Sequence, residues 1–129
     1  MDELYRENIL EHFKEPRNYG MLKDADVSHK ENNPVCGDEI EIALKFDKKN
    51  KSKLAEIKFQ GRGCAVSQAT ASILTEEVKG KETKQIQKLD STDIIEMIGI
   101  PLSPTRLKCA MLSLDTLKNA IQIHEKYLK

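Results

Sequence analysis

Two neighbouring stretches in the first half of the chain alternate between apolar and polar residues. Residues 39–46 and 55–60 both repeat with a period of two, which is typical of strands with one buried face. The lysine-rich residues 47–53 between them form a solvated polar turn, so the pattern predicts an antiparallel hairpin. The residues predicted to face the core are Ile40, Ile42, Leu44, Phe46, Ala55, Ile57 and Phe59.

Most of the remaining apolar residues recur at the spacing of helices. Five helices are predicted, over residues 2–14, about 64–80, 84–89, 92–98 and 104–127. The predicted core side of the second helix consists of Val66, Ala69, Ile73, Leu74 and Val78. The predicted core stripe of the last helix consists of Leu107, Ala110, Met111, Leu114, Lys118 and Ile121, with the lysine at its margin.

Strands early in the chain and helices late in it predict an α+β fold. We expect a small antiparallel sheet with the helices packed on one face. Residues 23–33 are polar and predict a loop, with an irregular strand as the alternative. The length of 129 residues suits a single domain over residues 1–129, and no repeat or Gly/Ser/Pro-rich linker divides it.

The balance of charges narrows the range of partners. Lysines and arginines number 21 and aspartates and glutamates also number 21, so no overall field favours nucleic acid or a membrane surface. Residues 1–7 carry acidic side chains where a signal peptide would be apolar. No stretch approaches the roughly 20 apolar residues that span a bilayer. A cytoplasmic protein that binds neither nucleic acid nor membrane is expected.

The three cysteines are an odd number, which excludes a complete disulfide framework. A hairpin folded about Asn50 brings Cys36 and Asp38, just before its first strand, close to Cys64, just after its second. Residues that are far apart in the sequence would then lie close together in space, as the ligands of a metal ion must. With no CxxC pair, a structural zinc domain or a thiol redox enzyme is disfavoured.

Cys64 lies at the predicted start of a helix, where unpaired N–H groups and the helix dipole stabilise a thiolate. The alternative is a small residue chosen for close helix–sheet packing, which the neighbouring Ser67, Ala69, Ala71 and Ser72 also permit.

Cys109 lies roughly 200° around the last helix from Leu107 at 100° per residue. This position is off the predicted core stripe, so we expect Cys109 to be accessible for chemistry.

Asp38 has two interpretations of equal weight. After Cys-Gly an aspartate can close a turn through backbone amides, or it can act as a fourth ligand beside three thiolates. Oxygen suits zinc but is a poor match for an iron–sulfur centre, which would therefore be easier to release. His12, His29 and His124 are expected to be surface or helix residues, and a ligand role for any of them is a minor alternative.

The three cysteines lie in three ordered motifs: Asn-Pro-Val-Cys-Gly-Asp at residues 33–38, Gly-Cys-Ala at residues 63–65 opening a Ser/Ala-rich helix, and Leu-Lys-Cys-Ala at residues 107–110. These motifs resemble those of the IscU/SufU/NifU iron–sulfur cluster assembly scaffolds. Residues 5–20 also resemble the opening helix and loop of this family, and residues 76–81 resemble its segment after the second cysteine.

The resemblance implies a scaffold that accepts sulfur from a cysteine desulfurase, with Cys36, Asp38, Cys64 and Cys109 as its ligands. In IscU-type members a transient [2Fe–2S] cluster is built on the cysteines and passed to recipient apo iron–sulfur proteins. In SufU-type members the same residues hold Zn²⁺ and the protein relays sulfur. The implied first sulfur acceptor is Cys109 in an IscU-like protein and Cys36 in a SufU-like one. A non-enzymatic scaffold is expected, with sulfurtransferase activity in the SufU-like alternative and an iron or electron donor as a further partner.

The chain combines features of the two branches. Lys108 replaces the histidine that precedes the third cysteine of IscU, and residues 102–106 depart from the Leu-Pro-Pro-Val-Lys segment that chaperones recognise in that branch. The motifs around Cys64 and Cys109 resemble SufU more closely. The spacing between these two cysteines is nevertheless close to that of IscU, without the extra segment of SufU.

Overall fold

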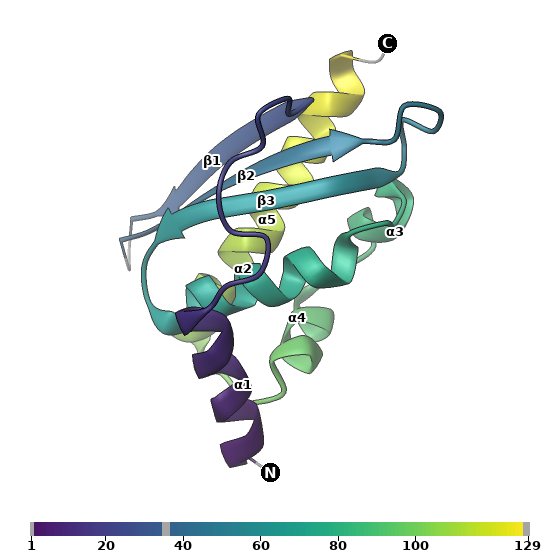
Figure 1. Cartoon of the computed structure of the whole chain (residues 1–129). Coiled ribbons are helices and arrows are strands. Elements are labelled where there is room, and N and C mark those ends of the chain that lie inside the picture. Colours follow the sequence, from purple (N-terminus) through teal and green to yellow (C-terminus); the bar gives the residue numbers. More distant parts are fainter. Residues whose placement is uncertain (1, 35–36, 128–129) are drawn as a thin grey trace.

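The computed structural model describes residues 2–34 and 37–127. Within these residues it contains three strands and five helices (Figure 1). In chain order they are α1 (Asp2–Lys14), β1 (Val27–Asn33), β2 (Asp38–Phe46), β3 (Leu54–Arg62), α2 (Ala65–Val78), α3 (Thr83–Gln87), α4 (Ser91–Ile98) and α5 (Pro104–Tyr127).

The strands form one antiparallel sheet in the order β1-β2-β3. At one end of this sheet Asn33 pairs with Asp38, and Glu39 pairs with Arg62 on the next strand. The end of β1, the start of β2 and the end of β3 therefore lie together at the same end of the sheet. The predicted hairpin of β2 and β3 is confirmed.

The helices pack on one face of the sheet, which confirms the predicted α+β class. Helix α5 packs against β1 and β2, α2 packs against β3, and α1 packs on α2 (Figure 1). The sheet contributes fully buried side chains such as Ile40, Leu44 and Phe59, and α5 contributes Leu114 and Leu117. Across the described residues, no helix has the length and apolar content needed to cross a membrane.

Strand β1 occupies residues for which the sequence predicted a loop, with an irregular strand as the alternative. Its burial alternates along the strand, but only Val27 at its start is apolar. The half-buried positions are occupied by polar residues such as His29 and Glu31, which form a hydrogen bond of 2.8 Å between His29 Nε2 and Glu31 Oε2. A strand with a polar inner row has no hydrophobic period to detect.

The inner row of β3 differs by one position from the prediction. Leu54 is buried and Ala55 is only half-buried, because the register of β2 and β3 shifts between Lys45 and Phe46. Phe46 pairs with Leu54, and Ala55 is the extra residue of the irregularity. Such a bulge reverses the side-chain alternation beyond it.

The buried faces of α2 and α5 are wider than the predicted stripes. Helix α2 lies between α1 and the rest of the core, so its buried residues include polar side chains while Ile73 is half-buried. On α5, Leu107, Met111 and Lys118 are at the margin, because this helix contacts the sheet on one side and α2 on the other. The buried residues of α5 are Cys109, Ala110, Leu112, Ser113, Leu114, Thr116, Leu117, Ala120, Ile121 and His124.

Candidate metal centre

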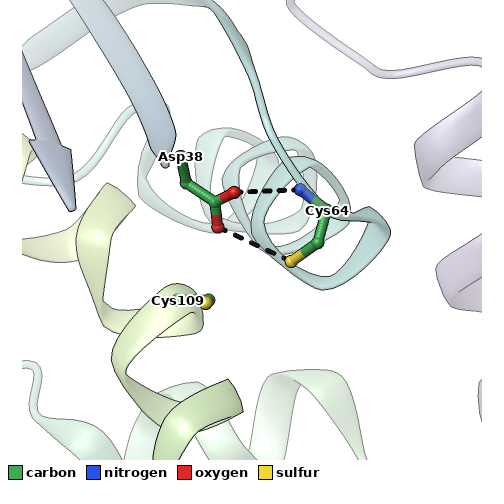
Figure 2. A group of neighbouring side chains, drawn as sticks. All are labelled: Asp38, Cys64 and Cys109. Atoms are coloured by element: carbon green, nitrogen blue, oxygen red, sulfur yellow. Dashed lines mark hydrogen bonds between the residues drawn. The ribbon is translucent and has the colours of Figure 1, made fainter. Parts of the chain in front are cut away.

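Asp38 is the first residue of β2, and its carboxylate is buried at 2% exposure. Asp38 Oδ1 accepts a hydrogen bond from the backbone N–H of Cys64 at 3.1 Å, and the Cys64 thiol donates to Oδ2 at 3.6 Å (Figure 2). The carboxylate therefore connects the start of β2 to the segment that follows β3. It is directed at Cys64 across the hairpin, within reach of the sulfur that a shared metal ion would bind.

Cys64 is the N-cap of α2, as the sequence predicted. Its backbone is extended, with φ −71° and ψ 164°, and its Sγ accepts a hydrogen bond from the backbone N–H of Ser67 at 3.4 Å. A cap residue normally satisfies this amide with a side-chain oxygen. Sulfur in this position lies where the helix dipole and an N–H group both favour a thiolate.

Gly63 allows the close approach of Asp38 to Cys64, a role that was not predicted from the sequence. A Cβ atom on Gly63 would lie 2.2 Å from Asp38 Oδ1, and the φ of this glycine is +153°. Both the space and the backbone conformation therefore require glycine. The available signal was the Gly-Arg-Gly sequence immediately before Cys64.

Cys109 lies near the start of α5 and is buried at 4% exposure. The expectation of an accessible Cys109 is wrong. The predicted core stripe was displaced around the helix, and Cys109 belongs to the broad face that packs against the sheet and α2. Its sulfur nevertheless lies within 4.8 Å of the ligand atoms of Asp38 and Cys64, and Figure 2 shows the three residues as neighbours.

The ligand atoms of Asp38, Cys64 and Cys109 all lie within 4.8 Å of one another. They come from β2, the N-terminus of α2 and α5, so the complete fold is needed to assemble them (Figures 1 and 2). Within the described part of the chain, Asp38 and Cys109 are buried and Cys64 is half-buried. Cys36, the remaining predicted ligand, lies outside the described residues and stays a prediction.

Two sulfurs and one carboxylate oxygen fit the ligand preferences of Zn²⁺ and of iron. A tetrahedral zinc with Zn–S distances of about 2.3 Å separates its sulfur ligands by roughly 3.8 Å. Ligand atoms within 4.8 Å of each other are therefore close to binding geometry and need only small side-chain movements. A fourth ligand would complete the tetrahedron.

The three histidines have other contacts. His12 is buried on α1, where its Nδ1 lies 2.7 Å from Ser72 Oγ, and His124 is buried on α5, where it stacks on Phe46 at 3.8 Å. Both lie on helices, as expected, and both are buried. His29 is half-buried on β1 and bonds to Glu31.

A groove of about 390 Å³ opens between the end of β1 and the first turns of α5. Asp115 lies in this groove, and burial, followed by the negative charge of Glu31, raises the pKa of its carboxyl while Lys118 opposes the shift. The groove also includes Lys108, the residue before Cys109, and Pro34. It adjoins both chain segments that carry the first and third cysteine motifs.

Known proteins match the chain along nearly its whole length. The profile of the NifU-like N-terminal domain matches residues 4–129. The zinc-dependent sulfurtransferase SufU of Bacillus subtilis is 34% identical, over 97% of this chain and 94% of its own. The iron–sulfur cluster assembly enzyme IscU of Drosophila melanogaster and the IscU scaffold of Aquifex aeolicus are both 38% identical, over 92% of this chain and 76% and 74% of theirs.

A solved structure shows the same fold. The putative iron–sulfur cluster assembly scaffold of the SUF system from Fervidobacterium islandicum superimposes with a TM-score of 0.75 at 27% identity, covering 89% of this chain and 94% of its own. The fold and the sequence together place the chain in the class of iron–sulfur cluster assembly domains. The chain belongs to the IscU/SufU/NifU family, through its NifU-like N-terminal domain.

Proposed function

We propose that this protein is an iron–sulfur cluster assembly scaffold. Its ligands would be Asp38, Cys64 and Cys109, with Cys36 as the fourth. The observation that carries the proposal is the convergence of three ligand atoms from three separate elements within 4.8 Å, in a chain of this family. A cytoplasmic location and a single domain over residues 1–129 belong to the same proposal.

The first step is the acceptance of sulfur from a cysteine desulfurase. A thiolate of the scaffold attacks the outer sulfur of the persulfide on the partner. A new S–S bond forms on the scaffold, and the partner's cysteine leaves as a thiolate. Cys109 is the acceptor in the IscU-like pathway and Cys36 in the SufU-like one.

Cluster assembly then uses ferrous iron as a substrate. Each sulfane sulfur needs two electrons from an external electron donor to become sulfide, and two sulfides bridge two irons in a [2Fe–2S] cluster. The thiolates would hold the irons, and the oxygen of Asp38 would be the weakest ligand because it is harder than sulfur. Such a ligand favours release of the cluster to recipient apo iron–sulfur proteins.

The second candidate is a zinc-dependent sulfur relay, and the SufU relative that matches most of the chain supports it. In this alternative Asp38, Cys64, Cys109 and Cys36 would hold Zn²⁺, which keeps its cysteine ligands deprotonated at neutral pH. Lys108 also favours it, since this residue replaces the histidine that precedes the third cysteine in IscU.

Anaerobic incubation with ferrous iron, cysteine, a reductant and a cysteine desulfurase tests the scaffold. We expect iron and acid-labile sulfide in equal amounts, and transfer of both to an apo-ferredoxin. Cys64→Ser should abolish the binding of iron and sulfide, while the circular dichroism of this variant stays native. Asp38→Asn is the second test variant, and its matched control is Asp47→Asn in the turn between β2 and β3. Retained zinc without sulfide, together with faster desulfurase turnover, would instead establish the relay.

A further inference from the structure

Two buried polar side chains in the first turns of α2 have no hydrogen-bond partner among the described residues. They are Ser67, through its Oγ, and Gln68, through its Nε2. Ser67 is 1% exposed and Gln68 is 7% exposed, so water reaches neither to any extent. Buried polar groups in folded proteins are paired in the great majority of cases, and an unpaired group calls for an explanation.

Ser67 and Gln68 lie close to Cys64 along the chain. They follow it by three and four positions, which places all three residues on the same side of the helix. Helical side chains generally lean toward the N-terminus of their helix, so the positions of Ser67 and Gln68 favour an orientation toward the end of α2 that Cys64 caps. The backbone amide of Ser67 already lies 3.4 Å from Cys64 Sγ.

The chemistry of the two groups selects an anion rather than a metal ion. An amide NH₂ donates hydrogen bonds and does not coordinate cations, and a hydroxyl can donate to the same acceptor. The N-terminus of a helix favours negative charge as well. The ligand should therefore be a negatively charged acceptor close to Cys64.

We propose that Ser67 Oγ and Gln68 Nε2 donate hydrogen bonds to an anionic sulfur atom held between Cys64 and Cys109. The sulfur is either the outer sulfur of a persulfide or the inorganic sulfide of a cluster, and this assignment rests on the proposed scaffold function. The two residues are positioning residues, which hold the sulfur without bonding to it covalently. Cys64 Sγ and Cys109 Sγ lie within 4.8 Å of one another, so one sulfur carried on either cysteine is close to both.

Removing the two polar groups should have opposite effects on the protein without bound sulfur and on the protein that carries it. In the empty protein the two polar groups are unpaired, so Ser67→Ala with Gln68→Met should leave the melting temperature unchanged or raise it. In the loaded protein the same double variant should lose sulfur about tenfold faster, the usual scale for removing groups that support metal-site ligands. A residue pair with only a packing role would not produce opposite effects.

The matched control is Thr70→Val on the same helix. Thr70 is also buried, but its hydroxyl donates to the carbonyl of Val66 at 2.6 Å. Its position lies on a different side of α2 from Cys64. This variant should retain sulfur as the wild type does.

The experiment follows sulfur retention in two arms. In the first arm, cysteine and a cysteine desulfurase load the wild type, the double variant and the control without iron, and mass spectrometry follows the decay of the added sulfur. In the second arm, ferrous iron and a reductant are included, and acid-labile sulfide is measured after gel filtration at increasing times. Faster loss from the double variant in either arm supports the proposal, and the arm identifies persulfide or cluster sulfide as the ligand.

Equal retention by wild type and double variant in both arms would overturn the proposal while leaving the scaffold function intact. A wild type that acquires sulfur in neither arm would overturn both. A double variant that is less stable than the wild type before loading would also contradict the assignment, because it would give Ser67 and Gln68 partners in the empty protein.

Discussion

Among single residues, Gly63 allows the Asp38 carboxylate to lie close to the Cys64 thiol. Gly63→Ala would place a methyl group 2.2 Å from Asp38 Oδ1 and force the carboxylate away from Cys64. We expect loss of metal binding as well as a strain of about 1–2 kcal/mol from the positive φ. Zinc titration followed by urea denaturation measures the two effects.

Gly20→Ala separates conformational strain from the clash. Gly20 has a φ of +129° and open space where a Cβ would lie. This variant should lose stability but bind zinc like the wild type. Equal zinc binding by Gly63→Ala and Gly20→Ala would show that the close approach of Asp38 is not needed.

Removing the charge of Asp115 and removing that of Asp47 should change the melting temperature in opposite directions. The pKa of Asp115 is raised by burial and by Glu31, so the stability linked to this group is present below its unfolded pKa and lost as the pH rises. Asp115→Asn should therefore raise the melting temperature at pH 7 by about 2 °C, the usual scale for a surface substitution. Near pH 3 the difference should disappear.

Asp47 supplies the opposite case. Backbone amides of Asn50 and Lys49 donate to its carboxylate and lower its pKa, so its contribution is present at neutral pH and lost as the pH falls through the folded pKa. Asp47→Asn should lower the melting temperature at pH 7. Melting curves at pH 7 and pH 3 that show the same sign for both variants would contradict this electrostatic account.

At the scale of elements, His12 connects α1 to α2. Its Nδ1 lies 2.7 Å from Ser72 Oγ, which also accepts a hydrogen bond from the Arg17 backbone N–H at 2.8 Å. A neutral imidazole can accept the serine proton at this nitrogen. Burial, followed by the charge of Arg17, lowers the pKa of His12, while Glu76 and Glu11 oppose the shift.

The packing of α1 should therefore weaken in acid. A histidine with a lowered folded pKa contributes stability above its unfolded value of about 6.5, and that stability is lost as the pH falls toward the folded pKa. We expect faster amide exchange in α1 at pH 5 than at pH 7.5, after correction for intrinsic rates. His12→Gln should remove this pH dependence and His29→Gln should retain it; a pH dependence that survives in His12→Gln would contradict the assignment.

The elements also show what the sequence could predict. The hairpin and the limits of α5 follow from clear apolar periods and from Pro104, so local pattern was sufficient. Strand β1 was predicted only as the alternative to a loop, because its inner positions are polar and its pairing with β2 is a tertiary effect. The burial of Cys109 was missed because α5 packs against two neighbours, which widens the buried face beyond any single stripe.

At the scale of the whole molecule, the candidate centre depends on the assembly of distant segments. Asp38 and Cys64 meet because β2 and β3 form a hairpin, a proximity that the sequence predicted from the symmetry about Asn50. The approach of Cys109 depends on α5 packing against both the sheet and α2. That contact has no local signature and was implied only by the resemblance to the family.

X-ray absorption at the zinc edge of the zinc-loaded protein reports whether Asp38, Cys64 and Cys109 hold the ion. We expect a four-coordinate ion with sulfur at about 2.3 Å and at least one oxygen ligand near 2.0–2.2 Å. Cys109→Ser and Cys64→Ser should each remove one sulfur from this shell, while Asp47→Asn should leave it unchanged. A first shell without sulfur, or one that neither cysteine variant alters, would show that these residues do not form the metal centre.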